Sequence, residues 1–518
     1  MVLQLLDRVH FRIPFLGAEI TPVAAVLATL GFVAFRRIYR LLKAYQTVNF
    51  FPKVYTAFQP FALPGLLVPT TKIWTTGLDW HWVRKSQTYA SNETVNLIPV
   101  LAGVPGLWTS NMEIGRQIAA GGHRSSFIKP PDSNNVFLTW GMNLAASEGQ
   151  MWRKHRRVVG PAFGTELYKL VWQQTARTYR DMVDAEGWKT KDVVDIPVIQ
   201  RITLKLAFLL ISTCGFGFPA TWDSPPKAAD GGMPVQEALK LVADTTLIAL
   251  VVPKWLMYLP IERLRMTRIA RERLAKFMQD QVTERKAEVA LGGDTRADAF
   301  TMLVKANQDE AGKYQLDDRE LIGNVFLFMF AGHETTAHSL AGTLGFMAIH
   351  EGIQNEVVEQ IMSVVGRDRD PDFDDYSKLD KVLAIFYEAA RMFPAGHALV
   401  REATEDTVLT GSSTIPIPKG TQVMVDMIGV QYNPRYFDDP YMYKPSRWYG
   451  LPADSELFTA FSVGYLLPCH LLRDWKVEPI LREGETKEAW GARIMDARIV
   501  LTLGVRDIPV RFVRRTHA

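Results

Sequence analysis

The sequence is poor in cysteine: its 518 residues include only two, Cys214 and Cys469. Two cysteines cannot build the multi-bridge scaffold of a small secreted protein, and so low a number is typical of a reducing compartment. The sequence also lacks a cluster of cysteine and histidine with the spacing of a zinc site. A disulfide scaffold is therefore excluded, and no structural zinc site is expected.

A marked excess of charge is absent as well. The chain has 59 Lys and Arg against 55 Asp and Glu, which gives a formal net charge of +4. So small and dispersed an excess predicts no nucleic-acid partner, because binding to phosphates needs a concentrated positive field. Internal repeats and low-complexity linkers are missing after residue 75, so the rest of the chain is expected to form one large domain.

An apolar run of 16 residues without a charge occurs near the N-terminus, at residues 20–35. As a helix it would be about 24 Å long, slightly less than the roughly 30 Å hydrocarbon core of a bilayer. Basic residues follow it directly and predict that the chain beyond them stays in the cytosol. They are Arg36, Arg37, Arg40 and Lys43. We interpret residues 1–45 as a single N-terminal membrane anchor with its basic stop; a buried or interfacial helix is the alternative.

Residues 46–75 contain several prolines, which remove backbone donors and break helices, so this segment is predicted to be a hinge. The prolines are Pro52, Pro60, Pro64 and Pro69. Beyond the hinge, helical periodicity dominates, at about 165–186, 199–213, 234–249, 263–290, 317–349, 351–365 and 378–393. Strand signals are confined to about 95–101, 407–417 and 421–426. Residues 76–518 are therefore predicted to form one mainly α domain with small β-sheets.

The helix predicted at 317–349 carries unusual residues in its apolar middle, among them Gly332, Glu334 and Thr335. Glycine costs about 1 kcal/mol inside a helix, and a threonine can hydrogen-bond to the preceding turn. Such a segment can open the helix and leave room for a small ligand, although a kinked buried helix would contain the same residues. Glu334 beside Thr335 then offers an acid and an alcohol for proton delivery.

Two further pairs have helical spacing. Glu388 and Arg391 lie three residues apart, so their side chains can form an ion pair, most often on a surface. Trp152 and Arg156 belong to a basic segment, residues 152–157, and offer an indole N–H and a guanidinium that suit a carboxylate. A solvated helix face is the alternative explanation for this segment.

In their order along the chain, these segments resemble the cytochrome P450 family. The resemblance extends to residues 443–448 (YKPSRW), which are similar to the family's F-x-P-x-R-F/W segment and contain Arg447. It covers nearly the whole chain. It implies the cytochrome P450 fold, an oxygen groove at Gly332 and a proton relay through Glu334 and Thr335. The resemblance further implies a structural triad of Glu388, Arg391 and Arg447, haem-propionate contacts from Trp152, Arg156 and Arg401, and a ligand segment that begins with Phe461 and Gly464.

The resemblance also implies a function. Members of the family are haem b monooxygenases, and the expected substrate is a lipophilic small molecule: a terpenoid, a steroid, a fatty acid or an aromatic compound. Electrons would come from NADPH through cytochrome P450 reductase, with cytochrome b5 as a second donor. The predicted anchor implies the endoplasmic reticulum membrane, with the catalytic domain in the cytosol. In amino-acid sequence, residues 151–163 and 331–338 are most similar to filamentous-fungal members of the family, especially those of basidiomycetes. This similarity suggests a role in secondary metabolism.

The resemblance breaks where the haem ligand should lie. The family pattern is F-x-x-G-x-R-x-C-x-G, but after Gly464 this chain has Leu466 at the arginine position and Pro468 at the cysteine position. Cys469 comes one residue late and is the candidate iron ligand. Only residues 465–470 precede the part that resembles the end of the next helix. As a helix these six residues span about 9 Å, against roughly 20 Å for four turns, so that helix is predicted to be truncated.

Three explanations of this segment stay open. A wrong exon junction would have deleted a short stretch and left an unrelated stub. Alternatively, the protein is a catalytically impaired relative that acts at most as a lipophile-binding membrane protein. In the third explanation, Cys469 ligates iron from a rebuilt loop. Cys214 lies far from the motif and is expected to be a small buried residue.

Overall fold

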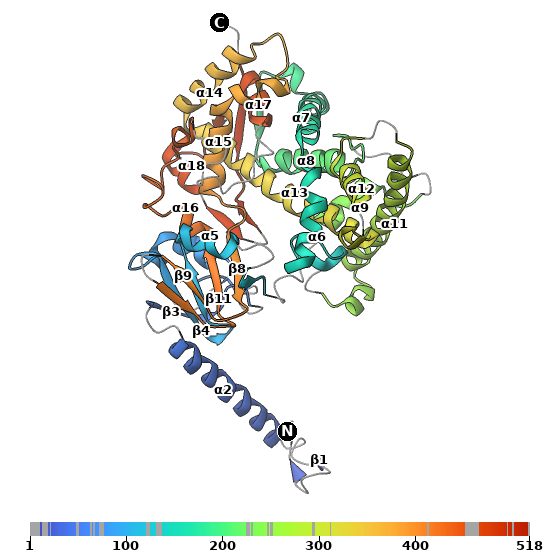
Figure 1. The fold of residues 1–518 in the computed structure, drawn as a ribbon. Coiled ribbons are helices and arrows are strands. Elements are labelled where there is room, and N and C mark those ends of the chain that lie inside the picture. Colours follow the sequence, from blue (N-terminus) through green and yellow to red (C-terminus); the bar gives the residue numbers. More distant parts are fainter. Residues whose placement is uncertain are drawn as a thin grey trace.

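The computed structural model describes most of the chain. It covers residues 11–12, 19–20, 22–47, 51–62, 65, 68–71, 77–120, 125–130, 137–223, 228, 231–245, 248, 252–292, 296–310, 312–411, 414–450, 466–494, 496–499 and 502–515. Helices form the larger part of the molecule, a β-rich region lies at one end of it, and one helix extends away from that region (Figure 1).

The helices follow the hydrophobic periodicity of the sequence closely. The long ones are α2 (Pro22–Thr47), α7 (Thr165–Ala185), α11 (Glu262–Ala290) and α13 (Asp318–Ile349). The shorter ones are α4 (Trp80–Arg84), α5 (Met112–Ala120), α6 (Gly149–Val159), α8 (Gln200–Leu210), α9 (Val235–Asp244), α12 (Ala299–Asp309), α14 (Glu351–Val364), α15 (Asp380–Met392), α16 (Met427–Gln431), α17 (Leu466–Asp474) and α18 (Lys487–Ile494). Every helical range predicted from periodicity overlaps one of these helices almost completely or for most of its length.

The largest sheet joins segments from both ends of the chain in the order β3-β4-β5-β11-β8-β6. Its strands are β3 (Lys53–Phe58), β4 (Thr94–Ala102), β5 (Gly106–Thr109), β6 (Phe127–Ile128), β8 (Ala398–Ala403) and β11 (Gln422–Asp426). Smaller sheets pair β12 (Trp475–Pro479) and β7 (Val193–Ile196) with β15 (Val510–Arg514), β9 (Thr407–Thr410) with β10 (Thr414–Ile417), β13 (Ala497–Ile499) with β14 (Leu503–Val505), and β1 (Phe11–Arg12) with β2 (Glu19–Ile20). The predicted strand region 407–417 is thus a hairpin of two strands.

Part of the segment predicted to be a hinge is a strand. β3 pairs in parallel with β4, with Val54 opposite Leu97. Pro52 and Pro60 lie just outside β3, where a missing N–H does not interrupt the ladder. Proline content alone therefore misplaced the hinge for residues 53–58.

Helix α13 runs through the middle of the helical part and packs against α8 and α15 (Figure 1). Its first turn is closed by a capping box: Glu320 N donates to the Asp317 side chain, and Asp317 N donates to the Glu320 side chain. The helix is almost completely buried beyond Ala337. These contacts make α13 the frame on which the candidate site is built.

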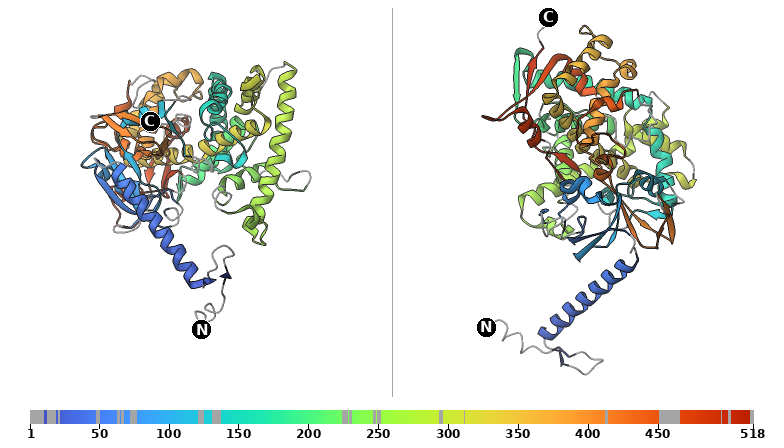
Figure 2. Two further views of the ribbon diagram at one scale, coloured as in Figure 1. Left: turned by 60° about the horizontal axis from the view of Figure 1, so that its bottom comes forward. Right: turned by 90° about the vertical axis from the view of Figure 1, so that its left-hand side faces the viewer.

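Helix α2 stands apart from this packing and projects from the β-rich end (Figures 1 and 2). Its apolar side chains are exposed, among them Val26, Leu27, Leu30, Phe32 and Phe35. Within the described residues, no helix is long and apolar enough to cross a membrane, so the predicted spanning anchor is not confirmed. The physical reason is that α2 continues through the basic residues that were expected to end the apolar run.

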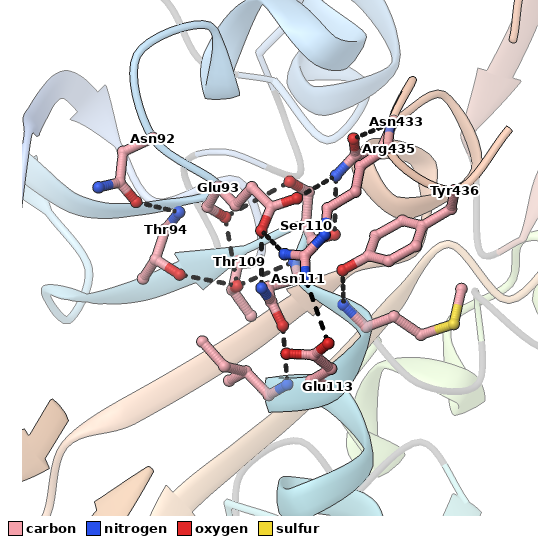
Figure 3. Close-up of polar contacts among 12 residues, drawn as sticks. Asn92, Glu93, Thr94, Thr109, Ser110, Asn111, Glu113, Asn433, Arg435 and Tyr436 are labelled. Atoms are coloured by element: carbon pink, nitrogen blue, oxygen red, sulfur yellow. Dashed lines mark hydrogen bonds and ion pairs between the residues drawn. The ribbon is translucent and has the colours of Figure 1, made fainter. Parts of the chain in front are cut away.

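A polar network around Glu93 ties the sheet to the chain that follows α16 (Figure 3). The Glu93 carboxylate accepts hydrogen bonds from Asn111 Nδ2 at 2.6 Å, Asn433 Nδ2 at 2.8 Å and Arg435 Nη1 at 2.9 Å. Arg435 also reaches Glu113 Oε1 at 3.1 Å. We call these five residues the Glu93 network; they join parts of the sequence that are more than 300 residues apart.

Candidate functional site

A buried polar cluster surrounds Glu388, which lies on α15 and is fully buried. Arg391 Nε donates to Glu388 Oε2 at 3.0 Å, and Arg391 Nη2 donates to Oε1 at 2.9 Å. Arg447 Nε donates to the same Oε1 at 3.1 Å. The structure therefore brings the three residues of the predicted triad together, and the pairing offsets the cost of burying their charges.

Two donors in this cluster were missed by the sequence analysis. Trp448 Nε1 donates to Glu388 Oε2 at 2.8 Å, and the backbone N–H of Lys444 donates to Oε1 at 3.0 Å. Arg391 in turn donates to the backbone carbonyl of Gln431 at 2.7 Å. We call Glu388, Arg391, Arg447 and Trp448 the Glu388 cluster; it fastens α15 to the segment that follows α16.

Gly332, Glu334 and Thr335 lie in the middle of α13, which continues through them without a break. Thr335 Oγ1 donates to the backbone carbonyl of Ala331, as expected of a helical threonine. A Cβ atom at position 332 would lie 2.5 Å from Ile211 Cδ1 in the adjoining π-helical turn. Glycine here permits a close approach of that turn, whereas the predicted opening of the helix is not present.

Glu334 is half-buried, and this burial raises the pKa of its carboxyl. His338 Nε2 lies 3.9 Å from Glu334 Oε1, one turn further along α13. Burial lowers the pKa of His338 to about 4, so both side chains are shifted toward their neutral forms. A carboxyl with a raised pKa is suited to holding and releasing a proton. His338 was not among the predicted site residues, although its spacing of four from Glu334 places both side chains on one face of the helix.

Arg401 is half-buried on β8, close to a carboxylate that the sequence analysis did not single out, Glu148. Burial lowers the pKa of Arg401, and Glu148 partly opposes that shift. Lys129 Nζ lies 3.3 Å from Glu148 Oε1. Arg401 Nη1 donates to the backbone carbonyl of Val400 at 2.8 Å. The predicted propionate-binding arginine therefore belongs to a small cluster of two cations and one carboxylate.

Glu148 directly precedes α6, which carries the other two predicted propionate contacts. Trp152 is half-buried and Arg156 is exposed. Within the described residues, Arg156 has no ion-pair partner, so its guanidinium is available to an external anion. The end of the sheet and the start of α6 thus bring two of the predicted contact segments into one region.

Cys469, the predicted iron ligand, is the fourth residue of α17 and is 1 % exposed. Pro468 lies in the first turn of that helix, where its missing N–H removes no helical hydrogen bond. Burial raises the pKa of the Cys469 thiol to about 12, and the charged groups that act on it are Arg473, Asp375 and Asp474. None of these belongs to the predicted cofactor contacts or to the polar segment of α13.

His470, the next residue, is also 1 % exposed. Its ring stacks on Tyr179 of α7 with centroids 5.1 Å apart, and neither ring nitrogen has a hydrogen-bond partner. Burial lowers the pKa of His470 to about 4. By contrast, Leu471 and Leu472 are apolar and completely buried. His470 is therefore poorly matched to its surroundings, whereas its buried apolar neighbours in α17 are well matched.

The residues fit the propionates of haem but not its iron. Arg156 and Arg401 are suitable donors to carboxylates, which haem carries as propionates. A haem-thiolate centre also needs a deprotonated sulfur that reaches the iron, and a thiol buried inside α17 with a raised pKa does not meet that need. Phe461 and Gly464, the predicted start of the ligand segment, lie outside the described residues. The described residues thus supply anion contacts but no axial thiolate through Cys469.

Comparison with known proteins agrees with this geometry. The sequence profile of the Cytochrome P450 family matches residues 119–465 and ends one residue after Gly464. Cytochrome P450 monooxygenase 124 of Postia placenta is 31% identical over 467 residues, which cover 84% of this chain and 88% of that protein. Cytochrome P450 monooxygenase ORF6 of Penicillium roqueforti is 26% identical, covering 72% of this chain and 68% of that protein.

Solved structures share the fold. The cytochrome P450 CYP102L1 has a TM-score of 0.64 at 18% identity, covering 90% of this chain and 99% of that one. A zebra fish cytochrome P450 with progesterone has a TM-score of 0.61 at 19% identity, covering 84% and 99%. The predicted mainly α fold with small sheets is confirmed. Since the profile matches more than half of the chain and the Postia protein exceeds 30% identity over most of its length, the chain belongs to the cytochrome P450 family, a family of monooxygenase oxidoreductases.

Proposed function

We propose that this protein is built to oxidise a lipophilic small molecule with O2, using haem b and electrons that a reductase delivers from NADPH, and that this activity requires a complete ligand segment in place of residues 465–470. The observation that carries the proposal is the Glu388 cluster, in which a fully buried carboxylate accepts hydrogen bonds from both predicted arginines. A cluster of this kind is costly unless every charge is paired, and it lies on the helix where the family resemblance places it. When bound, haem iron would supply the oxygen activation.

The chain's own polar residues would hold and position the other groups. Arg156, Arg401 and Trp152 would bind the haem carboxylates, because they offer two guanidiniums and an indole N–H from α6 and β8. Glu334 and Thr335 would hold a proton within α13: the carboxyl has a raised pKa, and the Thr335 hydroxyl already donates to the Ala331 carbonyl. The role of Gly332 in this proposal is to let the neighbouring turn pack closely.

The proposed location is the surface of the endoplasmic reticulum membrane. Support comes from α2, whose exposed apolar side chains would be costly to leave in water. At 26 residues the helix is about 39 Å long, and it also carries Arg36, Arg37 and Arg40. This combination suits a helix that lies in the headgroup region. Such a location would give access to substrates that partition into lipid.

The experiment that tests the function uses a graft. Residues 465–470 are replaced by the corresponding ligand segment of the Postia placenta relative, and the purified protein is supplied with haem, reductase and NADPH. With lipophiles and ¹⁸O₂, we expect labelled product that depends on NADPH. A graft that binds haem through thiolate but oxidises none of a broad panel of terpenoids, steroids, fatty acids and aromatics would contradict the proposal.

Two variants of the graft test the assigned residues. Thr335→Ala is expected to lower the yield of product per NADPH consumed, because the hydroxyl that carries the proton is lost. Arg156→Ala is expected to lower the haem content of the purified protein, because a propionate partner is lost. Exposed Arg153 on the same helix is the matched control, and Arg153→Ala should leave both readouts unchanged.

A second candidate function is favoured by the burial of Cys469. Without an axial thiolate, the same fold would bind a lipophile and carry out no redox chemistry. Equilibrium binding of a fluorescent lipophile to the ungrafted chain distinguishes this candidate, provided that oxidation is measured in the same samples. Binding without oxidation in the ungrafted chain, followed by oxidation in the graft, would assign the loss to the ligand segment alone.

A further inference from the structure

We infer that Cys469 is not an iron ligand in this chain, and that residues 466–470 occupy a structural position in α17 in place of a ligand segment. The inference rests on the proposed function, because only a haem protein needs such a ligand. Residues 466–470 depart from the family pattern in sequence, lie beyond the residues matched by the family profile, and include a buried histidine without hydrogen-bond partners.

The first argument is the place of the thiol. Cys469 lies inside a helix, in the same hydrophobic core as Leu467 and Leu471, and α17 packs against α7 and α14. To reach a metal, the sulfur would have to leave this core together with the first turn of α17. Its charged neighbours are Asp375, Arg473 and Asp474, none of which lies on α13 or α6. The charged groups that act on the sulfur are therefore not those of the proposed oxygen and propionate sites, although α17 also contacts α13.

The second argument is the contrast within α17. Leu471 and Leu472 are completely buried apolar residues, and the helix end is tied down by Asp474, which accepts a hydrogen bond from Tyr179 at 2.7 Å. His470, one residue before Leu471, is equally buried but has two ring nitrogens without partners. Buried polar atoms are normally hydrogen-bonded, so a histidine in this state does not suit its site. Among the described side chains of α17, this mismatch is confined to His470, directly before Leu471.

The third argument is that the sequence comparison changes at nearly the same place. The family profile stops at residue 465, one residue before α17 begins at Leu466 and five residues before His470. The nine residues of α17 extend about 14 Å, which is short of the roughly 20 Å of a four-turn helix. A segment that carries a ligand and the first turns of the helix has thus been replaced by residues that only continue the shortened helix.

The first test needs no variant and no activity. The full chain is treated with a small maleimide, with and without added hemin, and labelling of each cysteine is followed by mass spectrometry. Cys214, which is 4 % exposed and has a thiol pKa raised to about 12, is the internal control. We expect both thiols to be labelled at least tenfold more slowly in the native chain than in urea, with no effect of hemin on either. Rapid labelling of Cys469 alone that hemin suppresses would overturn the inference.

The second test is the absorption spectrum of the reduced chain with carbon monoxide, compared with Cys469→Ser, Cys469→Ala and Cys214→Ser. We expect no thiolate-type Soret band in any of them and the same haem content in all. A thiolate band that Cys469→Ser and Cys469→Ala abolish and Cys214→Ser keeps would overturn the inference while leaving the proposed function intact. A thiolate band in the Postia graft without oxidation has the opposite meaning: the function fails and the inference stands.

Discussion

The Glu388 cluster is largely buried, as are residues 467–470 of α17, and α15 and α17 contact each other. In the Glu388 cluster, one carboxylate accepts hydrogen bonds from Arg391, Arg447 and Trp448. In α17, by contrast, the His470 ring places two polar nitrogens in the core, and neither has a hydrogen-bond partner. The difference teaches that burial alone does not mark a well-evolved site; agreement between burial and hydrogen bonding does.

The largest effect on stability is expected from disrupting the Glu388 cluster. Glu388→Ala would leave the buried Arg391 guanidinium without its carboxylate, and we expect the free energy of unfolding to fall by about 3–5 kcal/mol. Chemical denaturation measures the change. Glu359→Ala is the control, since Glu359 is an exposed acid on α14, and it should change stability by about 0.5 kcal/mol or less. A similar small loss for Glu388→Ala would mean that the cluster is not buried as described.

Replacing the unpaired His470 in α17 is expected to increase stability. His470→Phe keeps a ring against Tyr179 and removes two unpaired nitrogens, so we expect the free energy of unfolding to rise by about 1–2 kcal/mol at pH 7. His81 is the matched control: it is equally buried, but its Nε2 lies 2.9 Å from His397 Nδ1. His81→Phe should destabilise the protein. Loss of stability in both variants would show that His470 has a partner after all.

The gain from His470→Phe should grow as the pH falls. Burial lowers the pKa of His470 to about 4 in the folded state, whereas an unfolded histidine titrates near 6.5. Between these values the unfolded state binds the proton and the folded state does not, so wild-type stability falls as the pH is lowered through this window. Denaturation at pH 7 and pH 5 should therefore show a wider gap at pH 5. A gap independent of pH would contradict the depressed pKa.

The smallest effect is expected in the Glu93 network, which is also centred on one glutamate and lies nearer to solvent. Arg435 is about half exposed, with a side-chain accessibility of 48%, so its ion pair with Glu93 is partly screened. Glu93→Gln keeps an acceptor and should lower the free energy of unfolding by about 1 kcal/mol or less. Raising the salt concentration should shrink this difference further. A loss as large as that of Glu388→Ala would erase the distinction between the two networks.

How much of this could be predicted depends on the range of the interactions. Hydrophobic periodicity located α13 and α15 within a residue or two, and the spacing of three placed Glu388 beside Arg391. Arg447 could be assigned through the resemblance alone, because 59 residues separate it from Glu388. The Lys444 N–H donor could not be foreseen at all, since a backbone donor leaves no mark in the sequence.

The errors have physical reasons too. Strand β3 was missed because its flanking prolines looked like a hinge, although they lie outside the ladder. The spanning anchor is not an error of this kind: it stays unconfirmed, because the helix formed by the apolar run continues into its basic residues. Cys469 could be flagged as displaced from the motif by counting residues. Its burial within α17 could not, because whether a new segment forms a loop or extends a helix depends on its tertiary contacts.

One guanidinium sets how α2 meets the body. Arg37 donates to the backbone carbonyls of Val100 at 3.0 Å and Gly103 at 2.6 Å, and also to that of Pro99. Three hydrogen bonds from one planar group restrict the rotation of α2 relative to the sheet, so α2 leaves the end of β4 in a fixed direction. A helix held in this way and lying on lipid would pass its own tilt on to the sheet and the helices packed around it. With α2 on lipid, as proposed above, the height of the body above the membrane would then depend on a single side chain more than 290 residues away from Glu334, the proposed proton carrier.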